Sequence, residues 1–177
     1  MLCGENTEGL SSSLEDYLEV IFHLEQSNRV ARAKDIAEQM SVQRASVTGA
    51  LKALAGRGLI NYSPYSFITL TPSGRDIARE VIHRHKVLKE FFANTLQLGV
   101  EDAEANACRI EHAIDPTATE RLVRFLEFVS ICPRTGNDWF DAFGRFCKLG
   151  LQTSDCLECL KLCMERLQTQ RIEEHEG

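Results

Sequence analysis

Hydrophobic residues recur at helical spacing through the first part of the chain. Near the N-terminus the apolar positions follow the i, i+3, i+4, i+7 spacing of one helical face, which predicts a helix over residues 13–26. These positions are Leu14, Tyr17, Leu18, Ile21 and Leu24. Shorter segments with the same period predict helices over residues 33–40 and 44–57, joined by a tight turn. Gly58 suits the C-terminal cap of the third helix.

The pattern then changes to two short β-prone segments, residues 59–62 and 67–70, with turn residues between them. We expect them to form a two-stranded wing. Two short helices joined by a tight turn and followed by a wing are typical of a winged helix-turn-helix. Further helices are predicted over residues 73–96, 101–113 and 117–131. Beyond a break at 132–137 we expect an aromatic-rich helix, a last helix over 154–170 and a charged tail.

Charge is distributed unevenly along the chain. The net charge is −6, but residues 28–91 carry a balance of +6, while residues 1–27 and 92–177 each carry −6. A basic middle between acidic ends favours contact with nucleic acid by the middle segment. From the pattern alone, a helical hairpin without a DNA role and a protein-binding winged helix both stay open.

No apolar run approaches the roughly 18 residues that span a bilayer, so we expect no membrane partner. The first residues lack the basic start and apolar core of a secretory signal, which predicts a cytoplasmic protein. Thiols stay reduced in that compartment. The seven cysteines are therefore better explained as metal ligands or buried thiols than as a disulfide framework.

The start of the predicted third helix carries side chains that suit base recognition. Arg matches guanine edges, Gln matches adenine, small hydroxyl groups reach bases or phosphates, and a methyl group can contact thymine. Lys contacts phosphate, which supplies affinity rather than sequence preference. The candidate DNA-binding residues are Gln43, Arg44, Ala45, Ser46, Thr48 and Lys52.

Residue types that bind metals recur on three predicted helices. Cys108, Glu111 and His112 have the i, i+3, i+4 spacing that places three ligand atoms on one helical face. Such a set suits a divalent first-row metal. Each feature taken alone also has a simpler explanation, such as a solvated carboxylate pair or a surface histidine. The other candidate ligands are Asp16 and Glu19 on the first helix and His85 on the long one.

In their order along the chain these features resemble the diphtheria toxin repressor family, which comprises iron- and manganese-dependent bacterial repressors, with the manganese transport regulators as its manganese branch. The resemblance covers about residues 12–131. It rests on Asp16-Tyr17-x-Glu19, Thr71-Pro72-x-Gly74, Arg84-His85 and Ala107-Cys108-Arg109-x-Glu111-His112.

The resemblance implies a homodimeric repressor of metal-uptake or homeostasis genes that binds a palindromic operator in double-stranded DNA, with no enzymatic activity and no small-molecule substrate. It implies a primary metal position and an adjacent second one, and metal occupancy would fix the spacing of the two DNA-reading heads. The primary ligands would be Asp16, Cys108, Glu111 and His112, and the second position would include Glu19 and His85.

The identity of the metal follows from ligand chemistry. Carboxylates favour Mn²⁺, whereas a thiolate at Cys108 favours Fe²⁺ or Zn²⁺, so we favour Fe²⁺. Two positions depart from the family pattern. Lys89 stands where members often carry a Glu ligand, which argues against a complete second site, and Glu104 stands where the iron branch carries His. Gly49 replaces a base-reading Gln of the iron branch, so the operator sequence does not carry over.

Five of the seven cysteines are concentrated near the C-terminus. They are Cys132, Cys147, Cys156, Cys159 and Cys163. Four thiolates could hold an iron–sulfur cluster or a structural Zn²⁺. Alternatively, several of these thiols are buried and pack against the aromatic residues of the preceding helix.

The sequence thus predicts a mostly α fold in three parts. Residues 1–74 form a winged helix-turn-helix DNA-binding domain, 75–131 an all-helical metal-binding and dimerisation domain, and 132–177 a Cys-rich helical extension and tail. One alternative is a redox or iron–sulfur-sensing regulator that uses the C-terminal cysteines. A metalloenzyme is less favoured, because the sequence shows no nucleophile–base pair and no Gly-rich phosphate loop.

Overall fold

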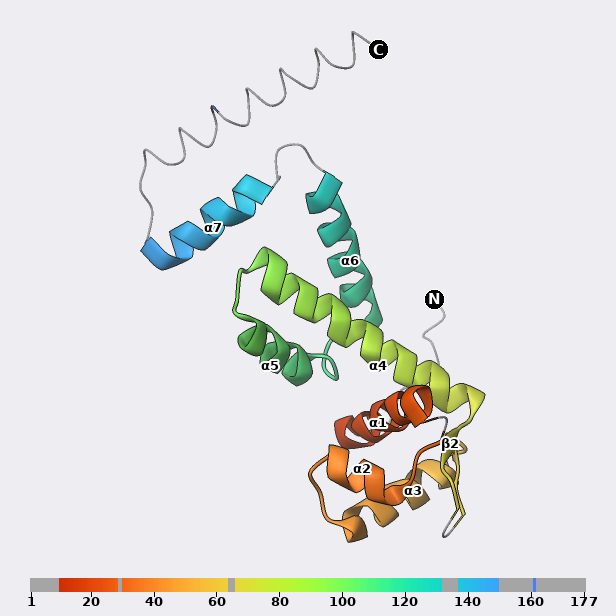
Figure 1. Cartoon of the computed structure of the whole chain (residues 1–177). Coiled ribbons are helices and arrows are strands. Elements are labelled where there is room, and N and C mark those ends of the chain that lie inside the picture. Colours follow the sequence, from red (N-terminus) through yellow and green to blue (C-terminus); the bar gives the residue numbers. More distant parts are fainter. Residues whose placement is uncertain (1–9, 29, 64–65, 132–136, 150–160, 162–177) are drawn as a thin grey trace. The chain divides into compact units, whose positions relative to one another are not determined.

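A computed structural model describes residues 10–28, 30–63, 66–131, 137–149 and 161 (Figure 1). These residues are mostly helical, which confirms the mostly α part of the predicted fold class. The chain divides into two compact units, residues 1–84 and 85–177. No helix in the described part combines the length and apolarity needed to cross a bilayer. The elements are, in order, α1 (Ser12–Asn28), α2 (Ala33–Gln39), α3 (Arg44–Gly56), β1 (Ile60–Asn61), β2 (Thr69–Leu70), α4 (Pro72–Glu90), the π-helical turn η1 (Phe91–Thr95), α5 (Val100–Ile110), α6 (Pro116–Ile131) and α7 (Asn137–Leu149).

The core of the first unit lies where α1 packs against α2, α3 and β2 (Figure 1). The apolar stripe of α1 faces this core, because residues three and four apart lie on one side of a helix. The helix begins one residue earlier and ends two residues later than predicted. The side chains with almost no exposed surface include Leu18, Ile21, Ile36, Leu51 and Leu54.

Helix α3 lies between two residues in left-handed backbone conformation, Ser41 (φ 55°) and Gly58 (φ 70°). At its C-terminal end the Gly58 N–H donates to the Ala55 carbonyl and the Leu59 N–H to the Leu54 carbonyl, each at 3.0 Å. This pair of bonds is the Schellman motif, which satisfies carbonyls that the helix itself leaves unpaired. The predicted cap at Gly58 is therefore confirmed.

The wing is shorter than the sequence predicts, since β1 and β2 contain two residues each. They pair antiparallel, with Ile60 opposite Leu70. Ala31, which precedes α2, extends the pairing through an isolated bridge to Ile68. Of the predicted strand residues outside this ladder, Leu59 and Ile68 are buried in the core, whereas Phe67 is exposed.

Gly74 lies where α4 passes close to the start of the wing. A Cβ atom at this position would lie 1.9 Å from the carbonyl oxygen of Leu59, so only glycine fits without a backbone shift. Thr71 caps the same turn: its hydroxyl donates to the Gly58 carbonyl at 2.8 Å and accepts from the Gly74 N–H at 3.2 Å. The Thr-Pro-x-Gly motif therefore fixes the connection between the wing and α4.

A buried carboxylate links three elements of this unit. The Glu25 side chain on α1 accepts a hydrogen bond from the Leu70 N–H of β2 at 2.8 Å and another from the Arg75 guanidinium of α4 at 2.5 Å. Arg75 also lies over the Phe22 ring, 5.8 Å from its centroid. Because hydrogen bonds to charged groups are stronger than neutral ones, Glu25 holds the wing strand and the start of α4 against α1.

In the second unit the predicted helix over residues 73–96 ends as an α-helix at Glu90 and continues as the π turn η1. Its i→i+5 bond runs from the Leu96 N–H to the Phe91 carbonyl at 3.1 Å. The Phe91 ring meets Phe92 and, on α6, Phe125 in edge-to-face contacts, with centroids 5.7 and 6.3 Å apart. Helices α5 and α6 both pack against η1, so this turn is the packing centre of the second unit.

The predicted aromatic-rich helix after the break is present as α7. Cys147 on α7 is an exposed free thiol, so it is not one of the buried thiols considered above. The remaining cysteines of the C-terminal group and the helix predicted over 154–170 lie outside the described residues. Those cysteines are Cys132, Cys156, Cys159 and Cys163.

Candidate metal centre and nucleic-acid interface

Helix α3 presents one apolar and one polar face. Val47, Leu51 and Leu54 are buried, whereas the side chains of Thr48, Lys52 and Ala53 between them are exposed. All six predicted DNA-binding residues are exposed: Gln43, Arg44, Ala45, Ser46, Thr48 and Lys52. The structure therefore leaves this face open for contact with a partner.

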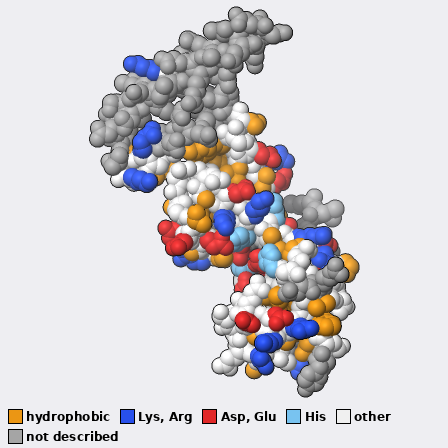
Figure 2. Space-filling model, viewed as in Figure 1, with side chains coloured by type: hydrophobic (Ala, Val, Ile, Leu, Met, Phe, Trp, Pro, Cys, Tyr) orange, Lys and Arg blue, Asp and Glu red, His pale blue; other side chains and the backbone are white. Residues whose placement is uncertain are grey.

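Basic side chains lie near this face. Lys and Arg residues gather at the end of the first unit that carries α2 and α3 (Figure 2). Arg32, just before α2, lies over the exposed Phe67 ring of the wing, with its guanidinium carbon 5.2 Å from the ring centroid. A cation–π contact of this kind orients the guanidinium while it stays accessible to solvent.

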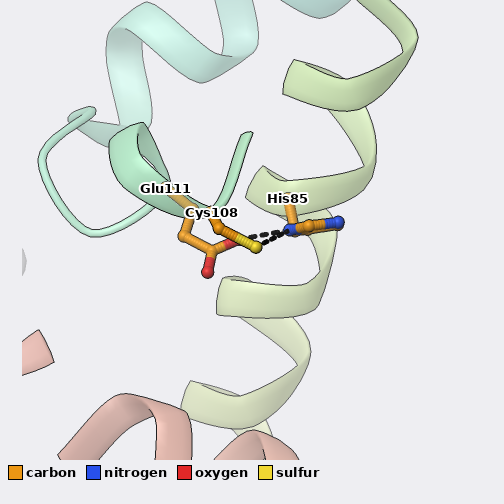
Figure 3. Close-up of side chains that lie close together, drawn as sticks. All are labelled: His85, Cys108 and Glu111. Atoms are coloured by element: carbon orange, nitrogen blue, oxygen red, sulfur yellow. Dashed lines mark hydrogen bonds and ion pairs between the residues drawn. The ribbon is translucent and has the colours of Figure 1, made fainter. Parts of the chain in front are cut away.

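In the second unit, three metal-binding residue types converge between α4 and α5 (Figure 3). His85 of α4 faces Cys108 of α5 and Glu111 at the C-terminal end of that helix, and the three ligand atoms lie within 4.8 Å of one another. The His85 Nδ1 atom lies 2.6 Å from a Glu111 carboxylate oxygen and 3.9 Å from the Cys108 sulfur. We call this group the His–Cys–Glu cluster.

The i, i+3 spacing of Cys108 and Glu111 places both side chains on the face of α5 that meets α4. Glu111 is buried, and its second carboxylate oxygen lies 3.4 Å from Nε2 of His112. One carboxylate thus lies between two imidazoles. The sequence assigned His85 to a second metal position, whereas in the structure it lies next to two of the residues assigned to the primary one.

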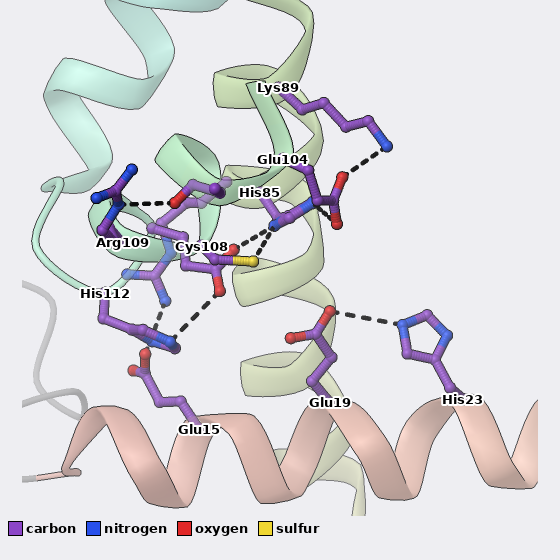
Figure 4. Close-up of polar contacts among 12 residues, drawn as sticks. Glu15, Glu19, His23, His85, Lys89, Glu104, Cys108, Arg109 and His112 are labelled. Atoms are coloured by element: carbon purple, nitrogen blue, oxygen red, sulfur yellow. Dashed lines mark hydrogen bonds and ion pairs between the residues drawn. The ribbon is translucent and has the colours of Figure 1, made fainter. Parts of the chain in front are cut away.

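The other ring nitrogen of His85 faces a second carboxylate (Figure 4). Its Nε2 atom lies 3.2 Å from Oε1 of Glu104, whose Oε2 atom lies 2.7 Å from the Lys89 ammonium. The hydrogen bond from Lys89 is the main cause that lowers the pKa of Glu104, and it outweighs the opposite effect of burial. Glu104 therefore carries its charge beside His85.

In the sequence, Glu104 and Lys89 stand out only as departures from the family pattern. A usable signal was present in their spacing. Lys89 lies four residues after His85 on α4, and Glu104 lies four residues before Cys108 on α5. Residues four apart share a helical face, so each of these residues lies beside a member of the His–Cys–Glu cluster.

The remaining candidate ligands belong to α1 in the first unit. Asp16 is half-buried, and Glu19 lies 3.5 Å from Nε2 of His23 one turn along the helix. On the same helix the buried carboxylate of Glu15 lies 3.6 Å from Arg84, which is also buried. The assignment of Asp16 and Glu19 as ligands stays a prediction.

The residues of the cluster fit a divalent first-row metal. They offer one imidazole nitrogen, one thiolate sulfur and one carboxylate oxygen, a mixed set that suits Fe²⁺, Zn²⁺ or Co²⁺. Ca²⁺ and Mg²⁺ are bound by oxygen ligands instead, so this set argues against them. The Lys89 ammonium is paired with Glu104, and the three ligand atoms face one another.

Comparison with known proteins places both units in one family. Residues 9–68 match the model of the iron-dependent repressor N-terminal DNA-binding domain, and residues 71–140 match the model of the iron-dependent repressor metal-binding and dimerisation domain. An HTH-type transcriptional regulator of Methanocaldococcus jannaschii is 36% identical over 119 residues, which cover 67% of this chain and 95% of that protein. The regulator MntR of Geobacillus kaustophilus is 32% identical over 116 residues, covering 66% of this chain and 82% of the relative.

Solved structures show the same fold. A manganese-dependent transcriptional repressor in complex with manganese aligns with a TM-score of 0.60 at 29% identity, covering 65% of this chain and 53% of that one. The manganese regulator SloR aligns with a TM-score of 0.59 at 29% identity, covering 68% and 56%. This chain thus spans little more than half the length of these two structures.

The fold, the cluster and the two domain matches together define a metal-dependent transcriptional repressor. The chain belongs to the iron-dependent repressor family. Members of this family are transcriptional repressors, which confirms the expectation that the chain is not an enzyme. The resemblance found in the sequence is likewise confirmed.

Proposed function

We propose that the chain is a homodimeric repressor that binds a palindromic operator of metal-uptake genes when Fe²⁺ is bound, with Mn²⁺ as the second candidate metal. The observation that carries this proposal is the convergence of His85 Nδ1, the Cys108 sulfur and a Glu111 oxygen within 4.8 Å. Solved relatives include a repressor in complex with manganese. A thiolate, however, binds Fe²⁺ or Zn²⁺ in preference to Mn²⁺, which is why Fe²⁺ comes first.

Each ligand has a defined part in the proposal. His85, Cys108 and Glu111 hold the metal within the second unit, and His112 lies beside Glu111. Asp16 and Glu19 are predicted from the sequence as further ligands. When bound, the metal supplies positive charge and a fixed link between its ligands. Metal that binds the DNA-competent form more tightly must in turn be bound more tightly in the presence of DNA.

The exposed face of α3 supports the DNA-binding part of the proposal. Its apolar residues are buried in the core, so its polar N-terminal side is left to enter a major groove, as in other helix-turn-helix proteins. Arg44 and Gln43 at the start of the helix have the side chains that distinguish guanine and adenine. Lys52, two turns further on, would contact phosphate.

An apolar face on α6 supports the homodimer. Phe125, Phe128 and Ile131 are 41%, 54% and 78% exposed, and they follow one another at three-residue intervals along the helix. Neighbouring exposed apolar side chains of this size mark an interaction surface. A second copy of the chain related by a two-fold axis would cover them, and the same symmetry would match a palindromic operator.

The proposal is tested by fluorescence anisotropy of a DNA fragment from upstream of the gene, titrated anaerobically with the full chain at fixed salt. The titration is run with chelator and then with Fe²⁺, Mn²⁺ or Zn²⁺. We expect tight binding only with metal, and we expect Glu111→Ala and His112→Ala to abolish the metal dependence. The matched control is Glu101→Ala, an exposed carboxylate on the same helix as Cys108.

Two outcomes would overturn the proposal. Tight binding that survives chelation would refute the metal dependence. Unchanged metal dependence in Glu111→Ala with retained helical content would refute the site. Tighter binding with Mn²⁺ than with Fe²⁺ at equal free metal would reverse our ranking of the metals.

A further inference from the structure

We propose that Glu104 is a positioning residue for the metal centre. Its carboxylate holds His85 in the tautomer with the ring proton on Nε2, which leaves the Nδ1 lone pair for the metal. Lys89 holds the Glu104 side chain in place. The inference rests on the proposed function, because it assigns a role toward the metal that the His–Cys–Glu cluster would bind.

The two ring nitrogens of His85 have different surroundings. Nδ1 faces the ligand atoms of Cys108 and Glu111, at 3.9 and 2.6 Å. Nε2 faces Oε1 of Glu104 at 3.2 Å. A metal bound with Cys108 and Glu111 therefore meets Nδ1, and the proton must then lie on Nε2. Metal-bound histidines generally donate their second ring N–H to a carboxylate or carbonyl, which fixes both tautomer and ring orientation.

Lys89 determines which oxygen of Glu104 is available to His85. Its ammonium lies 2.7 Å from Oε2, so Oε1 is left for the imidazole. The pair joins α4 to α5 beside the cluster, since Lys89 lies on α4 and Glu104 on α5. The positive charge of Lys89 is therefore paired with the Glu104 carboxylate.

The ion pair between Glu104 and Lys89 contributes little to the stability of the fold. The side chains of Glu104 and Lys89 are 46% and 44% exposed, and ion pairs this exposed contribute little to stability because water and salt screen them. The contact with His85 is different, because that side chain is only 18% exposed. Glu104 is thus better placed to orient His85 than to stabilise the fold.

The substitution Glu104→Gln separates these two roles. A carboxylate offers an acceptor oxygen to each neighbour, whereas a carboxamide has one acceptor oxygen and one donor NH₂ group. With its oxygen taken by Lys89, the amide of the variant presents NH₂ to Nε2 of His85. That donor favours a lone pair on Nε2, which is the tautomer opposite to the one that the metal needs.

The test uses the full chain and Cd²⁺, which has a magnetic isotope and suits thiolate and imidazole ligands. The first measurement is the affinity for Cd²⁺ by competition with a chelator. We expect Glu104→Gln to weaken binding by about 10–100-fold, the usual range for loss of an outer-shell partner. The matched control, Glu101→Gln on the same helix, should leave the affinity within about twofold, because Glu101 is exposed near the opposite end of α5.

The second measurement is the NMR coupling between cadmium and the ring nitrogens of isotope-labelled His85. We expect the coupling on Nδ1 and an attached proton on Nε2 in the wild-type protein. A structural defect alone would not move this signature. Lys89→Gln keeps the carboxylate beside His85, so it should retain the Nδ1 coupling and lose less affinity than Glu104→Gln.

The outcomes separate the two proposals. If the wild-type chain binds no Cd²⁺, Fe²⁺ or Zn²⁺, the proposed function fails and this inference fails with it. If the wild-type chain binds metal but cadmium couples to Nε2, Glu104 is on the ligand side and the inference alone is overturned. The same holds if Glu104→Gln binds as tightly as Glu101→Gln.

Discussion

Removal of the Glu25 carboxylate offers a direct test of how the first unit holds its wing. The Glu25 side chain is 7% exposed and accepts hydrogen bonds from the Leu70 N–H and the Arg75 guanidinium. In Glu25→Ala both donors lose their partner. An unpaired buried N–H costs about 1–3 kcal/mol, and a lost charge-assisted bond costs about 1.5–3 kcal/mol. Because Arg75 is 32% exposed and can turn to water, the lower part of that range applies to it.

The expected loss is therefore about 3 kcal/mol of the free energy of unfolding of the first unit. With a urea m-value of about 2 kcal/mol per M, the midpoint should fall by about 1.5 M. The assay is urea unfolding followed by far-UV circular dichroism. The matched control is Glu38→Ala, an exposed carboxylate on α2, which should change the stability by less than about 0.5 kcal/mol.

A double-mutant cycle with Arg75→Met apportions the loss between the two bonds. We expect a coupling free energy of at least about 0.5 kcal/mol between positions 25 and 75, because the groups are in direct contact. If Glu25→Ala unfolds at the same urea concentration as Glu38→Ala, the carboxylate does not hold the wing and the reasoning is wrong. A zero coupling with a large single-mutant loss would assign the whole effect to the Leu70 N–H.

Three further predictions concern the fold, the DNA interface and assembly. Gly74→Ala should lower the free energy of unfolding by about 1–3 kcal/mol, because the added Cβ would lie 1.9 Å from a backbone carbonyl oxygen. The control Gly56→Ala should not destabilise the protein, because a Cβ there would have nothing within 4 Å. Equal melting temperatures for the two variants would contradict this prediction. Arg44→Ala should weaken operator binding by about 1–3 kcal/mol and relax the preference at one base pair. Lys52→Ala should weaken binding to all DNA sequences alike and reduce the slope of the salt dependence by about one unit. Titrations of operator variants at several salt concentrations check both predictions, and a salt slope unchanged by Lys52→Ala would refute the phosphate role. Phe128→Asp should shift the chain toward monomer in sedimentation velocity, because a charge would lie in the apolar face of α6, and an unchanged dimer would show that the interface lies elsewhere.

Local patterns in the sequence predict most of the fold. The apolar stripe of α1 and the cap at Gly58 depend on residues close in the chain, where spacing and geometry are tightly related. The wing strands and the helix over 73–96 were predicted less well. Pairing in the wing stops after two residues, and the π turn at Phe91 depends on packing between η1, α5 and α6, which the sequence does not reveal.

Local spacing likewise predicts one part of the candidate site and not the other. Cys108 and Glu111 share a face because they lie on one helix, so their proximity follows from spacing. His85 lies 23 residues before Cys108, so its position beside them depends on how α4 packs against α5. Local spacing places Glu104 beside Cys108 on α5, but its contact with His85 depends on the same packing of α4 and α5, which the sequence does not reveal.

The two left-handed residues that bound α3 limit how this protein can diversify. Each residue added to an α-helix turns the following side chains by about 100°. An insertion or deletion inside α3 would thus either break the turn at Ser41 or the one at Gly58, or rotate Leu51 and Leu54 out of the core. New operator preferences should therefore arise in this lineage by exchange of side chains on the exposed face of α3, at constant helix length. Substitutions on that face can accumulate without loss of the core.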